Sequence, residues 1–347
     1  MADLFGAMIK AGKLVKKRRP LSAALALQKA LVPSPARTSA KRSKTASSSG
    51  RVRASSKTLP RPAPGTFLDE EFNCRQGALS YRFYTPRGSA RRRMPLIVML
   101  HGCSQTATDF AAGTDMNRLA DELGVLILYP QQSTAANFGR CWNWHDPANQ
   151  ERGRGEPAII AALTRHAIAL GRANPARVYI AGISAGGAAA AIIGAAYPDL
   201  YVAVGVHSGV PRGNVRSLSG AIAAMRGRNG PGPTGKLPRQ LPTIVFHGDN
   251  DRVVHPSNAT GFLTNLERST AGPLLSRTQS GLSQGGRHYT RRIYRNPAGE
   301  TLLEDWTIHG GGHRWSGGSA AGSHADPAGP DASREMLRFF LSRKRSK

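Results

Sequence analysis

Short apolar runs alternate with helical segments from Phe67 onwards. Leu96–Leu100 (LIVML) and Val125–Tyr129 are continuous apolar runs, which are typical of strands buried on both faces of a sheet. A helical stretch around Leu119 separates them. The same pattern continues as helix Ala158–Leu170, strand Val178–Ala181, helix Ala188–Ala196, strand Tyr201–Val206 and strand Thr243–Phe246. Strands that alternate with helices predict an α/β domain with a mostly parallel, doubly wound sheet.

Other segments predict antiparallel strands beside this sheet. Ala78–Thr85 alternates polar and apolar residues and predicts an antiparallel edge strand. Tyr289–Tyr294 and Leu302–Ile308 flank the turn sequence Asn296–Gly299 and predict a hairpin. Arg334–Leu341 predicts a closing helix.

The N-terminal part of the chain follows a different pattern. In residues 1–32 apolar side chains recur at helical spacing between lysines and arginines, and Pro20 suits the first turn of a second helical piece. This segment is therefore predicted to be a basic amphipathic helical segment. Residues 33–66 are rich in Pro, Ser, Lys and Arg without periodicity, which predicts a disordered linker. The folded domain is expected over residues 67–347.

Charge sets this N-terminal arm apart. The chain carries 48 Lys and Arg against 21 Asp and Glu, a net charge of +27, and residues 1–57 hold 14 of those basic residues with one acid, Asp3. Such a field attracts an anionic surface or granule, unless the arm is only a solvated tail. Its basic clusters lack interleaved aromatic residues on which bases could stack, so no specific nucleic acid partner is expected.

No membrane span and no convincing secretion signal is predicted. No apolar run approaches the ~20 residues that cross a bilayer. Pro20–Leu27 is a short apolar stretch followed by Gln28 and Lys29, which makes a poor signal peptide.

The segment Gly182-Ile183-Ser184-Ala185-Gly186 has the pattern G-x-S-x-G. A predicted strand runs into it and an alanine-rich helix follows, which is the strand–turn–helix setting that a nucleophilic serine needs. The alternative is a Gly/Ser-rich turn before a helix. Because the turn strains the serine, its neighbours two positions away must be small, and here both are glycine. Ser184 is therefore predicted to be a nucleophile for acyl transfer.

An acyl-transfer site also needs two N–H donors for the oxyanion. One is expected from Ala185, at the start of the helix that follows Ser184. The other is expected after an early buried strand, which here ends at His101-Gly102-Cys103-Ser104. The N–H of Cys103 or that of Ser104 is the candidate; otherwise this segment only turns the chain.

An acid and then a histidine should follow the serine along the chain. His247-Gly-Asp-Asn-Asp251 follows a buried strand and offers Asp249 and Asp251, between which spacing does not decide. His313 follows three glycines after the last core strand and is the candidate base, whereas His309 suits the end of that strand. The remaining loop histidines are expected to be structural or exposed: His207, His255 and His324.

Five ordered motifs resemble the polyhydroxybutyrate depolymerase family of esterases. They are HGCSQ (101–105), CWNW (141–144), GISAGG (182–187), HGDNDRVV (247–254) and HGGGHRWSGG (309–318). The resemblance covers about residues 67–342. The C-terminal segment 326–340 is also similar to the family. It implies an α/β-hydrolase fold, with Ser184 as nucleophile, Asp251 as acid and His313 as base. It also implies Cys103 and Ala185 for the oxyanion hole.

The same resemblance implies an ester substrate and no metal or cofactor. The family includes polyester depolymerases and is similar to feruloyl and acetylxylan esterases, so poly- or oligo-hydroxyalkanoate esters and plant-wall esters are both expected candidates. A non-catalytic protein that binds an anionic surface or nucleic acid through the basic arm is a third hypothesis. Many family members are secreted, and the location stays open between extracellular and cytoplasmic or granule-associated.

Tryptophans and cysteines near these motifs supply further candidates. Trp142, Trp144 and Trp315 could form an apolar wall for the substrate, although core packing is the alternative for such residues. The three cysteines Cys74, Cys103 and Cys141 show no metal-ligand spacing. Pairing of Cys103 with Cys141 would tie the oxyanion loop to the tryptophan loop, and the sequence leaves this open.

Overall fold

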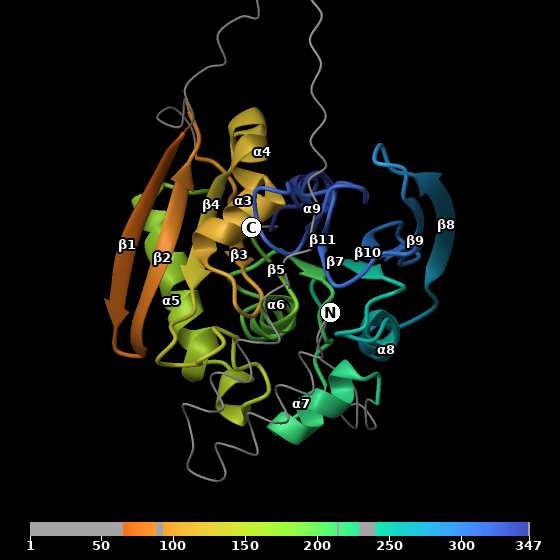
Figure 1. Ribbon diagram of the computed structural model, residues 1–347, viewed down its shortest axis with the longest axis horizontal. Coiled ribbons are helices and arrows are strands. Elements are labelled where there is room, and N and C mark those ends of the chain that lie inside the picture. Colours follow the sequence, from red (N-terminus) through yellow and green to blue (C-terminus); the bar gives the residue numbers. More distant parts are fainter. Residues whose placement is uncertain (1–64, 88–92, 214, 229–239, 346–347) are drawn as a thin grey trace, which may run out of the picture. The chain divides into compact units, whose positions relative to one another are not determined.

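A ten-stranded sheet forms the centre of the computed structural model, which describes residues 65–87, 93–213, 215–228 and 240–345. The strand order is β1-β2-β4-β3-β5-β6-β7-β10-β9-β8 (Figure 1). Neighbours from β4 (Leu126–Gln131) to β10 (Thr301–Ile308) are parallel. Antiparallel strands extend this parallel block at both ends. The predicted helical segment 1–32, and the predicted linker up to residue 64, lie outside the described residues.

The central strands are mostly apolar, as expected for strands whose two faces are both covered by helices. Every residue is buried in β3 (Leu96–Leu100), β5 (Val178–Ile183), β6 (Ala203–His207) and β7 (Thr243–Gly248). Alternate side chains enter two separate hydrophobic clusters, one on each face. The predicted doubly wound α/β architecture is confirmed in this part of the chain.

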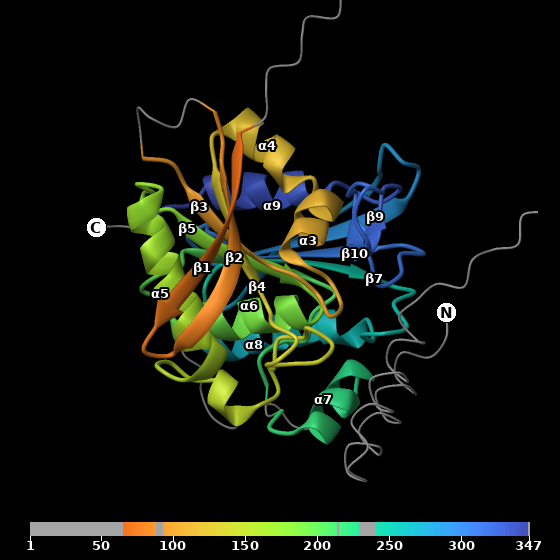
Figure 2. The same ribbon diagram turned by 60° about the vertical axis from the view of Figure 1, so that its left-hand side comes forward.

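Two sets of helices cover the two faces of the sheet (Figures 1 and 2). Side chains of α5 (Gly155–Leu170), α6 (Ala185–Ala196) and α8 (Ser257–Ser269) enter the first cluster. Those of α3 (Ala107–Thr114), α4 (Met116–Leu123) and α9 (Ala332–Leu341) enter the second. No helix in the described ranges is long and apolar enough to cross a membrane.

Smaller elements complete the described part of the chain. A 3-10 helix, η2 (Pro147–Asn149), precedes α5, and α7 (Leu218–Met225) follows β6. Short parallel strands β11 (Trp315–Ser316) and β12 (Ala325–Asp326) pair beyond β10. Ala221 and Ala224 of α7 join a third apolar cluster, which also contains Ala185.

The two edges of the sheet differ from the sequence prediction. The predicted edge strand 78–85 is β2 (Gly77–Thr85), which pairs on one side with β4 and on the other with β1 (Thr66–Cys74). The predicted hairpin is confirmed as β9 (His288–Arg295) and β10, but β8 (Leu275–Leu282) extends it. Both outer strands are largely exposed, so their sequences carry no apolar run and no strand was predicted.

Candidate active site

The predicted site residues follow parallel strands in the central part of the sheet. Ser184 follows β5, Asp251 lies in the loop after β7, and His313 in the loop after β10. Cys103 follows β3, the neighbour of β5 on the other side. Because these strands are parallel, their carboxyl ends meet at one edge of the sheet, where ligands bind in open α/β folds.

The backbone at Ser184 adopts the strained turn that its motif predicts. Its φ and ψ are 57° and −123°, a region that residues with a side chain rarely occupy. A Cβ at Gly182 would collide with the carbonyl oxygen of Gly186, and one at Gly186 would collide with that of Leu100. Glycine is therefore required on both sides, and helix α6 begins directly after the serine.

Hydrogen bonds in the loop after β3 separate the two candidate oxyanion donors. Ser104 donates its N–H to the carbonyl oxygen of Gly139 at 2.7 Å, so it is already engaged. Gly102 donates to Oε1 of Gln105 at 3.0 Å. Within the described ranges no acceptor takes the N–H of Cys103, nor that of Ala185 at the start of α6. These two groups remain available to a ligand.

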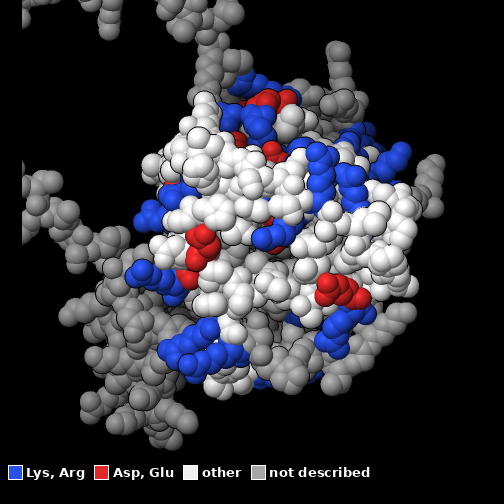
Figure 3. All heavy atoms as spheres, turned by 90° about the vertical axis from the view of Figure 1, so that its right-hand side faces the viewer, with Lys and Arg blue, Asp and Glu red and all other residues white. Residues whose placement is uncertain are grey.

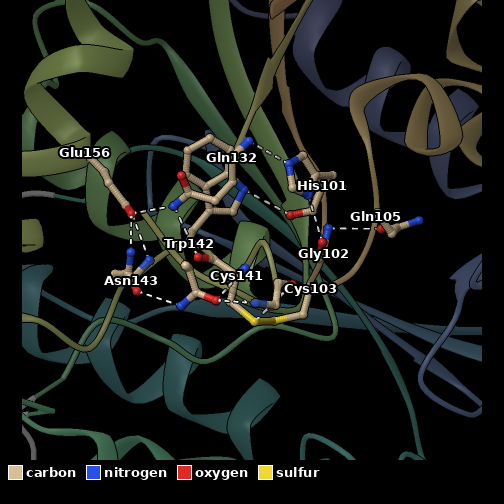
Figure 4. The surroundings of a disulfide bond; sticks show 11 residues. His101, Gly102, Cys103, Gln105, Gln132, Cys141, Trp142, Asn143 and Glu156 are labelled. Carbon is tan, nitrogen blue, oxygen red and sulfur yellow. Dashed lines mark hydrogen bonds between the residues drawn. A yellow bond between two sulfur atoms is a disulfide. The ribbon is translucent and has the colours of Figure 1, made fainter. Parts of the chain in front are cut away.

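A disulfide joins Cys103 to Cys141, with the two Cα atoms 4.2 Å apart (Figure 4). It ties the loop after β3 to the loop that carries the CWNW motif, 38 residues further along the chain. Cys74, in β1, is a free and partly exposed thiol. The pairing that the sequence left open is thus present in the structure.

Polar groups behind the disulfide hold the same two loops (Figure 4). Nε2 of His101 accepts the N–H of Gln132 at 3.0 Å, and the His101 carbonyl accepts the indole N–H of Trp142 at 3.1 Å. Gln132 in turn donates to Oε1 of Glu156 at 2.6 Å. Burial lowers the pKa of His101 to about 4, so its ring is neutral at pH 7 and can accept. Burial raises the pKa of Glu156, although hydrogen bonds from Asn143 and Gln132 oppose the shift.

Asp251, which is buried, and His313, which is partly buried, form an acid–base pair. Oδ2 of Asp251 lies 2.7 Å from Nδ1 of His313, and its Oδ1 accepts the N–H groups of Val253 and Val254, both at 2.9 Å. Burial alone would raise the pKa of Asp251. The His313 ring, the nearby His247 and the backbone donors outweigh it and lower that pKa to about 2. The carboxylate is therefore ionised at neutral pH and able to orient the ring of His313.

Asp249 belongs to a different pair at the surface. Its Oδ2 lies 2.9 Å from Nδ1 of His309, and its Oδ1 accepts the N–H of Gly310 at 2.6 Å. Oγ1 of Thr290 lies 2.9 Å from Nε2 of His309. Both members of this pair are exposed. The two aspartates thus have separate histidine partners, a distinction that sequence spacing could not make.

Residues 79–272, more than half of the chain, match the family model described as esterase PHB depolymerase. The chain belongs to this family. Poly(3-hydroxyalkanoate) depolymerase C of Paucimonas lemoignei is 28% identical over 264 residues, which cover 70% of this chain and 60% of that protein. Feruloyl esterase B of Neurospora crassa is 31% identical over 219 residues, 57% of this chain and 72% of that protein.

Comparison with solved structures shows the fold. Acetyl xylan esterase from Aspergillus awamori superposes with a TM-score of 0.62 at 18% identity, covering 80% of this chain and 99% of that one. Together with the parallel sheet and the turn at Ser184, this similarity shows an α/β-hydrolase fold.

Two of the three tryptophans proposed as a substrate wall are core residues of this family member. The indoles of Trp142 and Trp315 are each 1% exposed. Their N–H groups are taken by the His101 carbonyl and by Oγ of Ser333. The structure favours the core-packing alternative for these two, because a side chain packed in this way offers little surface to a ligand. Trp144 is also largely buried, but it packs in the same cluster as Ala185, next to the proposed nucleophile.

Sequence reasoning missed the role of buried histidines around the site. His101, His207 and His247 each lie at the carboxyl end of a central strand and are almost wholly buried. Nε2 of His247 lies 2.9 Å from the carbonyl oxygen of Val254 and 3.5 Å from Oδ2 of Asp251. The signal in the sequence is a histidine that follows or closes a buried apolar run, as at 101, 207 and 247.

Proposed function

We propose that this protein is a serine esterase that cleaves carboxylic esters through an acyl-enzyme on Ser184. The Asp251–His313 hydrogen bond carries the proposal, because it supplies the oriented imidazole that a serine nucleophile requires. The strained turn at Ser184 and the free N–H groups of Cys103 and Ala185 supply the other parts of an acyl-transfer site.

In the proposed reaction His313 takes the proton of Ser184 as its oxygen attacks the ester carbonyl. The N–H groups of Cys103 and Ala185 stabilise the oxyanion, and Asp251 stabilises the imidazolium of His313. His313 then donates its proton to the leaving alcohol. Water, activated by the same ring, releases the acid and restores the serine.

The substrate class is proposed from the relatives. The match to a poly(3-hydroxyalkanoate) depolymerase covers more of this chain than the matches to feruloyl and acetylxylan esterases, and favours a poly- or oligo-hydroxyalkanoate ester. The feruloyl esterase, at 31% identity, supports plant-wall esters as the second candidate. The partly buried side chains that pack against the apolar cluster of Ala185, among them Val215, Met225 and Val253, are where an alkyl or aryl group would pack.

Docking of this enzyme on an anionic surface or a polyester granule is proposed from the sequence of residues 1–57 alone. Outside that arm, Lys and Arg side chains on the face in Figure 3 form separate groups with uncharged surface between them. Some arginines in the described part of the chain form ion pairs, among them Arg291 with Glu304 and Arg287 with Asp326.

A panel of substrates tests both the activity and its class. The full-length protein would be assayed on p-nitrophenyl esters of increasing chain length, 3-hydroxybutyrate oligomers, a feruloyl ester and acetylated xylan. Ser184→Ala is the control for catalysis by the proposed site. Preference for the oligomers supports the first substrate class, and preference for feruloyl or acetyl groups supports the second. Absence of hydrolysis across the panel would contradict the proposed function.

A further inference from the structure

His207, the last residue of β6, is fully buried and hydrogen-bonded at both ring nitrogens. Nε2 accepts the backbone N–H of Ser316 at 3.0 Å, and Nδ1 lies 3.1 Å from Oγ of Ser208. A backbone N–H can only donate, so Nε2 carries no proton and Nδ1 carries it. The ring stacks between Trp315 and Phe246, with centroids 5.2 and 5.9 Å away. His207 is therefore held as one neutral tautomer in one orientation.

This residue contacts both halves of the proposed catalytic machinery. Its carbonyl oxygen accepts the N–H of Ser184 at 2.9 Å, which fixes the backbone of the strained turn. Its ring binds Ser316, three residues after His313. The strand β6 lies between β5, which leads to Ser184, and β7, which leads to Asp251. A single residue thus links the serine turn, through its backbone carbonyl, to the loop that carries the proposed base, through its ring.

The loop around His313 needs such an anchor because its other side is rich in glycine. Gly310 has a φ of 68°, and Gly310–Gly312 place no side chain against neighbouring elements. On that side the loop is fixed by the Asp249 and Asp251 contacts already described. On the far side the Ser316 N–H has the His207 ring as its acceptor, and Oγ of Ser316 donates to the carbonyl oxygen of Pro330 at 2.7 Å.

We propose that His207 is a positioning residue that sets the placement of His313 relative to Ser184 by accepting the Ser316 N–H on its neutral Nε2. This inference rests on the proposed esterase function. A displacement of about 1 Å between reacting groups costs on the order of 100-fold in rate. The loss should fall on kcat rather than KM, because His207 itself is buried and has no surface to offer to a substrate.

Three substitutions at His207 test the hydrogen bond separately from the packing. His207→Phe keeps a ring between Trp315 and Phe246 but removes the acceptor. His207→Gln places an amide oxygen where Nε2 lies and can still accept the Ser316 N–H. The shorter side chain of His207→Asn places its amide only where Nδ1 lies, so it cannot accept the Ser316 N–H. With p-nitrophenyl acetate, kcat should fall about 100-fold for Phe and Asn and at most about tenfold for Gln, with KM within about twofold throughout. The rate of Ser184 labelling by diisopropyl fluorophosphate should follow the same order.

Tyr201→Phe is the matched control for loss of a buried hydrogen bond. Tyr201 is fully buried, and its hydroxyl lies 2.8 Å from Oγ1 of Thr164, at the opposite end of β6. It should lower the melting temperature without lowering kcat. If His207→Phe does not fold, the comparison of Gln with Asn decides the matter. Equal kcat for the Gln and Asn variants, or a kcat of the Phe variant within about threefold of wild type, would overturn the inference. The proposed esterase function would still stand if wild type is active and Ser184→Ala is not. A wild-type protein without esterase activity would overturn both.

Discussion

Asp251 and His313 are joined by a 2.7 Å hydrogen bond between Oδ2 and Nδ1, while Asp249, two residues earlier, is bonded to His309. The two pairs bridge the same two loops. The inner pair, Asp251 and His313, is largely buried, whereas the outer pair, Asp249 and His309, is exposed. Only the inner pair includes the histidine that follows the glycine run, and it is the inner pair that we propose for catalysis.

Replacing the two aspartates should therefore have unequal effects. Asp251→Asn is expected to lower kcat about 10⁴-fold, because the amide no longer holds the His313 tautomer that can accept a proton. Asp249→Asn, the matched control, is expected to retain most of the activity. Steady-state rates on a p-nitrophenyl ester check both. A larger loss in the Asp249 variant would assign the acid to the outer pair.

Ser184→Ala should remove ester hydrolysis while leaving the fold intact. Loss of a triad nucleophile typically lowers turnover on the order of 10⁶-fold. The melting temperature should not fall, because alanine is close to serine in size and the substitution removes no packing contact in the core. Rates would be compared at equal protein concentration after circular dichroism confirms folding. Retention of even a tenth of the wild-type turnover would exclude Ser184 as nucleophile.

The Cys103–Cys141 disulfide should stabilise the protein. It closes a loop of 38 residues, and loss of such a bridge typically costs about 2–5 kcal/mol of unfolding free energy. Cys141→Ser should therefore lower stability in urea, and Cys74→Ser, at the free thiol, should not. Alkylation of the unfolded, unreduced protein should label one cysteine, and after reduction three. Three labels without reduction would show that the bridge is absent.

Stability should fall as the pH drops below about 6.5. Burial lowers the pKa of His101 to about 4 and of His207 to about 3, and also lowers that of His247. Between pH 6.5 and 4 the unfolded chain binds protons at His101 and His207 that the folded protein does not bind. Each of these two rings therefore lowers the free energy of unfolding by up to about 1.4 kcal/mol per pH unit as the pH falls. Asp251 acts in the same direction only at lower pH, since its stabilisation is lost as the pH falls from about 4 towards 2.

Urea denaturation at pH 7, 6 and 5 measures this dependence. His207→Gln removes one of the titrating rings and should reduce the slope, which makes it the internal control. The same pH dependence in wild type and His207→Gln would mean that the His207 ring is protonated in the folded state or open to solvent.

Deletion of residues 1–57 should separate surface docking from catalysis. Hydrolysis of a soluble p-nitrophenyl ester should change little, because every proposed catalytic group lies at or beyond Cys103. Co-sedimentation with anionic vesicles or polyester granules should weaken and lose part of its salt dependence, since 14 of 48 basic residues are removed. Equal co-sedimentation of both proteins would reduce the arm to a solvated tail. Lower activity together with a lower melting temperature would place the arm on the hydrolase domain.

Local pattern was enough to predict the central part of the fold. Runs such as Leu96–Leu100 predict buried strands because a strand covered on both faces has no polar position. The turn at Ser184 could be predicted for a similar reason, since its strain and its small neighbours are properties of five consecutive residues. The outer strands β1 and β8 could not, because a strand exposed on its faces is polar and resembles a loop.

The sequence by itself predicted the central strands along the chain, the proposed nucleophile and the segments in which its proposed partners lie, all of which depend on residues close together in the chain. Tertiary structure alone decided which aspartate meets which histidine across about 60 residues, that Cys103 meets Cys141, and that Trp142 and Trp315 are buried. It also brought the ring of His207 to the loop of His313. Spacing along the chain does not encode these contacts, because they arise only when strands distant in sequence lie side by side in the sheet.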